Sequence, residues 1–416
     1  MFSNKLISRV FPTWLNLTLL TLLLGSALPA TPAYAAGSIV VNSNTDDTLI
    51  NLNANATCDL REAIINANAD NQSGSTDCAA GNGTDTITFA ADYTITLGSQ
   101  LPAVTGTIVI NGNGAAKTII QASDCNPITL LNSSNSACTA VPYRVFEVGT
   151  SGNLTFDSLT VRNGNCNGSC ATYAQGGGGI YNKGILAVKN SLFSANKAGD
   201  AGAGLFNDGS IVTINASTFF DNSSSNAGGA IYNGSGTMTI SNSTIANNSA
   251  TGNTGGGLGN SGTLNIYNST VSFNTSASLN WDGDNIYNSG TLNLYNTIVS
   301  GSSFHGDCFN NGGTVNSTNS LVESTGTQAC GLVNHDNGNI IGSVANLDVI
   351  TGSPAYYPLQ ADSPAINAGN NAICAAAPVS NTSQNGVTRP QGGHCEIGSY
   401  ELDPLMHKLF LPLILR

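Results

Sequence analysis

A repeat of about 26 residues between Gly176 and Ser302 constrains the fold of this chain more than any other feature. Apolar residues recur at intervals of 26, 26, 26 and 28 residues, and a second apolar column two positions later keeps the same steps. The first column is Leu186, Val212, Met238, Leu264 and Leu292, and the second is Val188, Ile214, Ile240, Ile266 and Leu294. A period this regular is typical of a solenoid, in which each repeat stacks on the one before it.

Within each repeat the pattern alternates with a period of two, as in Thr263-Leu264-Asn265-Ile266-Tyr267, which predicts strands with one buried face. Several short strands separated by glycine and asparagine turns fit into one repeat, and helices do not. The sequence therefore predicts an all-β fold, a right-handed single-stranded parallel β-helix with aliphatic side chains in its interior.

Polar columns follow the same register. One asparagine column precedes the long strand of each repeat, a second follows it, and a serine column comes directly after the second. These columns are Asn182, Asn207, Asn233, Asn260 and Asn288; Asn190, Ala216, Asn242, Asn268 and Asn296; and Ser191, Ser217, Ser243, Ser269 and Thr297. Stacked amides can hydrogen-bond along a column, and asparagine tolerates the left-handed backbone of tight corners. We interpret the columns as structural, with ligand binding as the alternative.

The repeat resembles a known family in its short motifs. Gly228-Gly229-Ala230-Ile231, Phe193-Ser194-Ala195-Asn196 and Phe219-Phe220-Asp221-Asn222 are similar to the GGAI and FxxN repeats of the polymorphic outer membrane proteins. Those repeats resemble the pectate-lyase-like β-helix class. The resemblance implies the fold and leaves the function open, because such folds host many activities.

The segment from Cys58 to Asn68 predicts a short amphipathic helix at the start of the solenoid. Asp59 and Glu62 form a capping-box pattern, and one face carries Leu60, Ala63, Ile64 and Ala67. A solenoid needs such a cover, since its first coil would otherwise expose apolar surface and strand edges. The motif Cys-Asp-Leu-Arg-Glu-Ala resembles the CSLREA domain of exported bacterial and archaeal repeat proteins. We interpret Glu62 as part of the cap and Arg61 as a salt-bridging surface residue, with a catalytic pair as the alternative.

The first 36 residues have the pattern of a secretory signal. Lys5 and Arg9 supply positive charge, Leu15 to Leu28 is mostly apolar, and Ala33-Tyr34-Ala35 offers a cleavage site. A retained membrane anchor is the alternative. We divide the chain into a signal peptide (1–36), a cap with the first coils (37–125), β-helix repeats (126–345) and a C-terminal closing region (346–416).

The closing region resembles the choice-of-anchor Q domain in Pro358–Gly369 and around Arg389-Pro390. That family has an acidic residue and Arg before the Arg-Pro step, whereas this chain has Ser383–Gly386, which puts a salt bridge or metal role there in doubt. The tail His407–Arg416 is apolar but too short to cross a bilayer. It is expected to dock as a last strand or to act as a short export or anchoring signal.

Ten cysteines fall in neighbouring couples without metal-like spacing, which favours disulfides over zinc in an exported protein. The expected pairs are Cys58–Cys78, Cys125–Cys138, Cys166–Cys170, Cys308–Cys330 and Cys374–Cys395. Spacing alone leaves their connectivity open.

The charge and composition of the chain limit the classes of partner that it is expected to bind. A net charge of −12 argues against nucleic acid, and the plentiful, periodic aliphatic residues argue against disorder. We expect extracellular glycans or cell-surface and matrix components as partners, a monomer, and membrane contact only through an unidentified anchor. No cofactor is implied with certainty, and calcium is the candidate.

Three aspartates form the best candidate for a calcium site. Asp282, Asp284 and Asp307 precede two neighbouring strands together with His305, and a step of 23 residues would stack Asp284 on Asp307. The alternative is that they are solvated turn residues, and no basic residue is predicted beside them. Lys183 and Asp208, in neighbouring coils, are expected to form an exposed ion pair.

Tyr267 and Tyr295 point outward on adjacent coils and could stack as a glycan platform or simply stabilise the sheet. No GxSxG elbow or phosphate loop supports other chemistry. The sequence therefore predicts a secreted or cell-surface, adhesin-like scaffold that binds glycans or matrix without catalysis. The alternative is an extracellular lyase or glycoside hydrolase acting on acidic polysaccharide.

Overall fold

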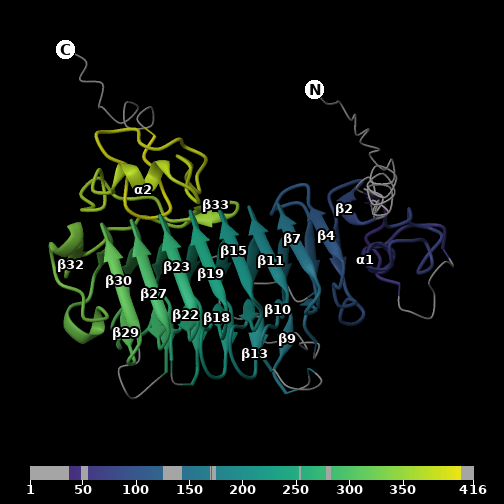
Figure 1. Ribbon diagram of the computed structural model, residues 1–416, viewed down its shortest axis with the longest axis horizontal. Helices are drawn as coiled ribbons and strands as arrows, with labels where there is room; N and C mark the ends of the chain where they lie inside the picture. Colours follow the sequence, from purple (N-terminus) through teal and green to yellow (C-terminus); the bar gives the residue numbers. More distant parts are fainter. Residues whose placement is uncertain are drawn as a thin grey trace, which may run out of the picture. The chain divides into compact units, whose positions relative to one another are not determined.

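The computed structural model describes residues 37–47, 55–124, 143–168, 170, 175–252, 254–277 and 283–403. Within them the chain coils into a right-handed parallel β-helix, which confirms the fold predicted from the repeat (Figure 1). Four parallel sheets run along the solenoid, and each coil contributes one strand to most of them. The predicted signal peptide and the apolar tail lie outside the described residues.

Sheet 1 holds the long strands of the repeat and sheet 2 the strands that follow them. Sheet 1 contains β1 (Gly37–Val41), β2 (Thr84–Phe89), β4 (Thr107–Asn111), β7 (Asn153–Asp157), β11 (Ile185–Lys189), β15 (Ile211–Asn215), β19 (Thr237–Ser241), β23 (Thr263–Tyr267), β27 (Thr291–Tyr295) and β30 (Thr314–Thr318). Sheet 2 contains β3 (Thr94–Thr96), β5 (Ile119–Gln121), β8 (Thr160–Arg162), β12 (Leu192–Ser194), β16 (Thr218–Phe220), β20 (Thr244–Ala246), β24 (Thr270–Ser272), β28 (Ile298–Ser300), β31 (Leu321–Val322) and β32 (Ile340–Ile341).

Sheets 3 and 4 are built from strands that are shorter than those of sheet 1. Sheet 3 contains β6 (Phe146–Val148), β10 (Ile180–Asn182), β14 (Leu205–Asn207), β18 (Ile231–Asn233), β22 (Leu258–Asn260), β26 (Ile286–Asn288) and β29 (Cys308–Asn310). Sheet 4 contains β9 (Asn165–Cys166), β13 (Lys197–Ala198), β17 (Ser223–Ser224), β21 (Ser249–Ala250) and β25 (Thr275–Ser276).

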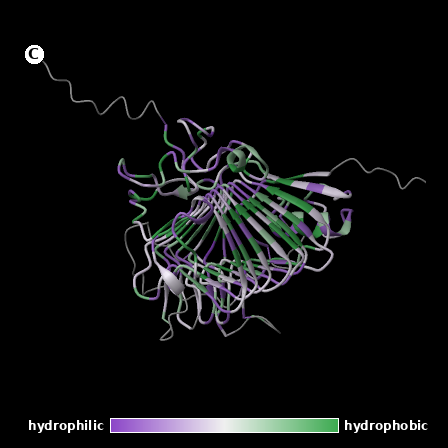
Figure 2. Cartoon of the chain, turned by 60° about the vertical axis from the view of Figure 1, so that its left-hand side comes forward, coloured by the Kyte–Doolittle hydropathy of each residue, from purple (hydrophilic) through white to green (hydrophobic). Residues whose placement is uncertain are grey.

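The core is a set of stacked apolar rows, and the register agrees with the sequence period. Leu186 pairs with Val212, Val212 with Met238, and Leu264 with Leu292, and all of them are buried. Hydrophobic residues accordingly line the strands of the solenoid (Figure 2). The rings of Phe193 on β12 and Phe219 on β16 stack at 4.7 Å between centroids, which fills the volume between successive coils.

The predicted asparagine column on sheet 3 is a continuous ladder of amides, which are buried from Asn182 to Asn288. Each Nδ2 donates to the Oδ1 of the next coil at 2.8–2.9 Å, from Asn182 through Asn207, Asn233, Asn260 and Asn288 to Asn310. A second ladder, which we call the FxxN ladder, joins Asn196, Asn222, Asn248, Asn274 and Asn285 and ends at Asp307. Both ladders satisfy polar groups that burial would otherwise leave without partners.

The corner between sheets 1 and 2 requires left-handed backbone, as the asparagine column predicts. The φ angles are +47° at Asn190, +48° at Asn242 and +46° at Asn296. Ala216 occupies the same corner at +47°, where its Cβ makes the conformation costly. The serine column completes the corner, because the backbone N–H of Ser217 donates to the Oγ of Ser243 at 3.1 Å.

The predicted capping helix is present as α1 (Leu60–Ala69), which contacts β1, β2 and β4. Asp59 and Glu62 form the capping box, and the apolar face of the helix is buried. The interpretation of Arg61 as a surface residue is wrong. Arg61 is only 2% exposed, although it does form a salt bridge as expected: its guanidinium donates to both carboxylate oxygens of Asp46 at 2.8 Å.

The C-terminal region, described for residues 346–403, covers the side of the solenoid rather than its last coil (yellow in Figure 1). It contains β33 (Thr351–Gly352), β34 (Ala355–Tyr356) and α2 (Asn371–Ala375). Gln384 accepts a hydrogen bond from Thr244 at 2.6 Å and donates to Thr218 at 2.9 Å, on neighbouring strands of sheet 2. Two short 3-10 helices, η1 (Gly326–Gln328) and η2 (Asp336–Gly338), instead contact β29 and β30 at the end of the coils.

Candidate functional site

Asp284 precedes β26, and its carboxylate is buried and fully hydrogen-bonded. Oδ2 accepts the backbone N–H groups of Ser303, Phe304 and His305 at 3.0–3.1 Å, while Oδ1 accepts from the backbone and hydroxyl of Ser276 and lies 3.1 Å from His305 Nδ1. Burial alone would raise the pKa of Asp284, but these hydrogen bonds outweigh it and hold the pKa below its usual value. The carboxylate of Asp284 therefore links the loop 303–305, which lies between β28 and β29, to Ser276 of β25.

The predicted stacking of Asp284 on Asp307 is wrong by one position. Sheet 3 advances by 22 residues between these coils, whereas sheet 1 advances by 23. Asp307 therefore aligns with Asn285. The extra residue lies in the turn 311–313, which is one residue longer than the turn of the preceding coil and absorbs the difference.

Asp307 is the last member of the FxxN ladder. Its Oδ1 accepts from Asn285 Nδ2 at 2.9 Å and from the backbone N–H of Ser302 at 3.3 Å, and its Oδ2 accepts from the backbone N–H of Ser324 at 2.7 Å. Burial raises the pKa of Asp307, although the hydrogen bonds from Ser324 and Ser302 oppose this shift. A carboxylate suits this place, since Asn285, Ser302 and Ser324 all donate hydrogen bonds to it.

The calcium site predicted at Asp282, Asp284 and Asp307 remains a prediction. Asp282 lies outside the described residues. Across the residues that the structure describes, no group of three or more His, Cys, Asp or Glu side chains could hold a metal ion. The oxygens of Asp284 and Asp307 are already used by the chain itself, so a cation would have to displace several N–H donors.

Tyr267 and Tyr295 form the expected pair on the outer face of sheet 1. Their ring centroids lie 4.6 Å apart and their planes differ by 18°. Both side chains are half-buried. Burial raises the pKa of Tyr267, and the neighbouring Tyr295 adds a smaller shift in the same direction. The Tyr267 hydroxyl therefore stays protonated at neutral pH and offers an uncharged hydrogen-bonding group.

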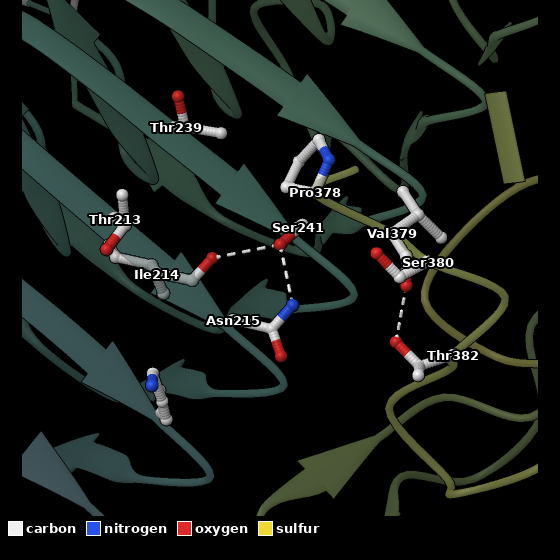
Figure 3. Close-up of a pocket in the computed structure, with 10 residues that line it drawn as sticks. Thr213, Ile214, Asn215, Thr239, Ser241, Pro378, Val379, Ser380 and Thr382 are labelled. Carbon is white, nitrogen blue, oxygen red and sulfur yellow. Dashed lines mark hydrogen bonds between the residues drawn. The ribbon is translucent and has the colours of Figure 1, made fainter. Parts of the chain in front are cut away.

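A groove lies in line with this tyrosine pair, between sheet 1 and the C-terminal region (Figure 3). Its volume is about 370 Å³. On one side Lys189, Asn215 and Ser241 pair in register on β11, β15 and β19, and the next residue in this row is Tyr267. Pro378, Val379 and Ser380 form the opposite wall. Asn215 Nδ2 donates to Ser241 Oγ at 2.7 Å, so the floor of the groove is an ordered row of polar groups.

A second aromatic surface, which we did not predict, runs along the outer face of sheet 3. We call it the aromatic stripe, and it consists of Tyr181, Phe206, Tyr232, Tyr287 and Phe309. Where two rings lie on adjacent coils, their centroids are 5.2–6.1 Å apart, and Gly259 separates Tyr232 from Tyr287. The signal was present in the sequence, because an aromatic residue directly precedes the ladder asparagine in all but one of these coils.

The stripe ends at a cluster of charges on its N-terminal side. Lys183 pairs with Glu147 at 2.8 Å, so the predicted ion pair of Lys183 with Asp208 is wrong. Glu147 lies one coil back and also pairs with Arg144, which places it between two positive groups. Asp208 instead lies 3.3 Å from the hydroxyl of Tyr181.

The C-terminal region contains a buried charge cluster of its own. Arg389 Nη1 lies 3.2 Å from Glu401 Oε2, so this region does contain a salt bridge, supplied by Glu401 rather than by the segment before Arg389. Burial lowers the pKa of Arg389 to about 10. Burial and the neighbouring Glu401 raise the pKa of Glu396 to about 8.

Four of the five predicted disulfides are present, namely Cys58–Cys78, Cys166–Cys170, Cys308–Cys330 and Cys374–Cys395. Cys125 and Cys138 lie outside the described residues. Disulfides of this number indicate an oxidising compartment. No helix in the described part of the chain is long and apolar enough to cross a bilayer.

No family model matches the chain, and neither a curated protein nor a solved structure is significantly similar to it.

Proposed function

We propose that this protein is an exported or cell-surface scaffold that binds extracellular glycans and does not cleave them. The observation that carries the proposal is the stacked pair of Tyr267 and Tyr295 in line with the groove beside sheet 1, whose floor carries Asn215 and Ser241. Sugar rings have apolar faces that pack on aromatic rings and hydroxyl groups that bind amides and hydroxyls. The row from Lys189 to Tyr295 offers both kinds of group on one rigid sheet.

The rigidity of the scaffold supports binding. Each side chain of the row is placed by a strand that pairs on both sides, so little conformational entropy is lost when a ligand binds. The four disulfides and the acidic surface are compatible with an extracellular setting. We include in this proposal that the first 36 residues are an export signal and that the chain is related to the CSLREA and choice-of-anchor proteins.

Catalysis is the weaker alternative. A polysaccharide lyase needs a base beside carboxylates that hold a cation, and a hydrolase needs a pair of carboxylates facing the substrate. Asp284 and Asp307 are buried, and their oxygens accept hydrogen bonds from the chain. The carboxylates of Asp284 and Asp307 therefore hold the chain's own loops in place and are not free to act on a substrate.

The proposal can be tested by affinity electrophoresis of the full chain in gels that contain β-glucan, xylan, mannan or polygalacturonate. We expect retardation by at least one polysaccharide. Replacing both Tyr267 and Tyr295 by alanine should weaken binding roughly thirtyfold, since each of the two lost ring contacts is worth about 1 kcal/mol. The matched control is Thr318→Ala, the next residue of the same row, which lies outside the stack.

The same polysaccharides, incubated with the protein and calcium, should release neither new reducing ends nor unsaturated products. Release from any of them would overturn the non-catalytic proposal. Unchanged retardation of the double tyrosine variant would show that the site is elsewhere.

A further inference from the structure

The aromatic stripe of sheet 3 has a regular geometry that the glycan groove of sheet 1 does not explain. Strand pairing puts Tyr181, Phe206, Tyr232, Gly259, Tyr287 and Phe309 in one outward row, one residue per coil. With strands roughly 4.8 Å apart, five steps cover about 24 Å. Four of the five rings are half-buried, so each presents part of its surface to solvent.

The tyrosine rings of the stripe all lean in the same direction, toward the next coil. The hydroxyl of Tyr181 lies 3.3 Å from Asp208, that of Tyr232 lies 3.0 Å from Ser261, and that of Tyr287 accepts from Asn311 at 2.6 Å. Each partner directly follows the ladder asparagine of the next coil. The rings therefore overlap along the sheet and lie against it, instead of projecting into solvent.

Gly259 shows how close this overlap is. A Cβ at Gly259 would lie 2.7 Å from a ring carbon of Tyr232, so only glycine leaves room for the ring to lie on the strand. The glycine interrupts the row of aromatic residues, but the ring of Tyr232 covers the gap. The apolar surface is thereby continued from β18 toward β26.

The polar groups beside the stripe are neutral along most of its length. Ser261, Ser289 and Asn311 border it on successive coils. The charged groups that contact its rings or its first coil lie at the Tyr181 end, where Arg144 and Lys183 are balanced by Glu147 and Asp208. Together with the net charge of −12, this arrangement disfavours a polyanion.

We infer that the aromatic stripe is a second glycan-binding surface, which takes a linear, uncharged polysaccharide along the axis of the solenoid. One ring per coil suits a chain of flat sugar units whose apolar faces pack on the rings. The bordering hydroxyl and amide groups supply hydrogen bonds to the edges of the sugars. The ligand class rests on the proposed glycan-binding function, but the site is on a different sheet.

The binding role of the stripe is tested in the full chain that already carries Tyr267→Ala and Tyr295→Ala. In this background the groove and tyrosine pair of sheet 1 contribute as little as possible to the measured polysaccharide binding. The probes are mixed-linkage β-glucan and xylan as neutral chains and polygalacturonate as a polyanion. Into this background we introduce Tyr232→Leu with Tyr287→Leu, or Tyr232→Phe with Tyr287→Phe. Leucine keeps apolar contact without the flat ring, whereas phenylalanine keeps the ring and removes the hydroxyl.

We expect the leucine pair to bind a neutral polysaccharide at least roughly tenfold more weakly than its parent, and the phenylalanine pair to bind within about threefold of it. Phe304→Leu is the matched control, because this exposed ring lies on another loop and should leave binding unchanged. Urea unfolding of each variant shows whether the leucine pair is still folded.

Four results would overturn the inference. In the first, a folded leucine pair binds the neutral polysaccharides as tightly as its parent. In the second, the background variant binds none of them although the unmutated chain does, which assigns all binding to sheet 1 and leaves the proposed function intact. If the unmutated chain also binds none, both proposals fall together with their common ligand class. If only polygalacturonate binds, the argument from charge is refuted.

Discussion

Replacing Asn248 in the middle of the FxxN ladder should destabilise the protein far more than replacing a half-buried asparagine on an outer face of the solenoid. Asn248 Oδ1 accepts both the backbone N–H and the Nδ2 of Asn222 at 2.9 Å. Its Nδ2 lies 2.9–3.0 Å from the carbonyl oxygens of Phe219 and Ala246 and from Asn274 Oδ1. The side chain is thus both acceptor and donor inside the buried core.

The magnitude follows from these contacts. Asn248→Ala leaves the buried backbone N–H of Asn222 without its acceptor, which costs about 1–3 kcal/mol. The two carbonyl hydrogen bonds add about 1 kcal/mol each. We therefore expect a loss of about 3–5 kcal/mol in the free energy of unfolding. Asn248→Asp should cost at least as much at neutral pH, because a carboxylate cannot donate to these oxygens, and part of the loss should be recovered in acid, where it is protonated.

The matched control is Asn293→Ala on the outer face of sheet 1. Asn293 also belongs to a ladder, since it donates to Asn265 Oδ1 at 2.7 Å and accepts from Asn316 Nδ2 at 2.8 Å. Water can replace both bonds there, so the loss should stay below about 1 kcal/mol.

Urea unfolding gives the free energies, and hydrogen exchange gives a local test at one atom. The backbone amide of Asn222 should exchange much faster in Asn248→Ala than in the parent. Equal losses for Asn248→Ala and Asn293→Ala, or unchanged protection of the Asn222 amide, would refute the reasoning that the ladder stabilises the coils through buried hydrogen bonds.

Three further predictions follow from single sites. Ala216→Asn should raise the free energy of unfolding by about 0.5–1 kcal/mol in urea, because Ala216 has a φ of +47° in a column otherwise made of asparagine; no gain would contradict the strain. Calcium and EDTA should leave the melting temperature unchanged, since the oxygens of Asp284 and Asp307 already accept hydrogen bonds; a clear rise with calcium would restore the predicted metal site. Glu396 has a folded-state pKa of about 8 against an ordinary value of 4.5, so its contribution to stability is fully present below pH 4.5 and is lost as the pH rises through about 8. The melting temperature should therefore fall across this interval, and Glu396→Gln should flatten the fall; an unchanged slope would contradict the raised pKa of Glu396.

Much of the fold could be predicted because a solenoid repeats its contacts. The period of the apolar columns determines which residues stack, and stacking predicts the strands, the asparagine ladder on sheet 3 and the left-handed corners. The helix α1 was predictable for a local reason, since its capping box and apolar face lie within ten residues of each other. Neighbouring cysteine couples likewise gave the described disulfides.

The candidate site was less predictable because it depends on one-residue differences in the register between neighbouring coils. A single extra residue in the turn 311–313 moves Asp307 from Asp284 to Asn285, and no period reveals a change of one residue within a coil. The aromatic stripe was missed for a different reason. Its residues vary between Tyr, Phe and Gly, so the column is visible only when side-chain size is compared across coils.

The sequence by itself determined the solenoid, its N-terminal cap and the outward direction of Tyr267 and Tyr295, because these depend on contacts between residues close in sequence or one repeat apart. Only the tertiary structure decided that the C-terminal region packs along sheet 2, where Gln384 binds Thr218 and Thr244 more than 100 residues earlier. The same packing forms the groove on sheet 1. Such contacts join segments with no common period, so their geometry appears only once the coils are stacked and the outer faces are covered.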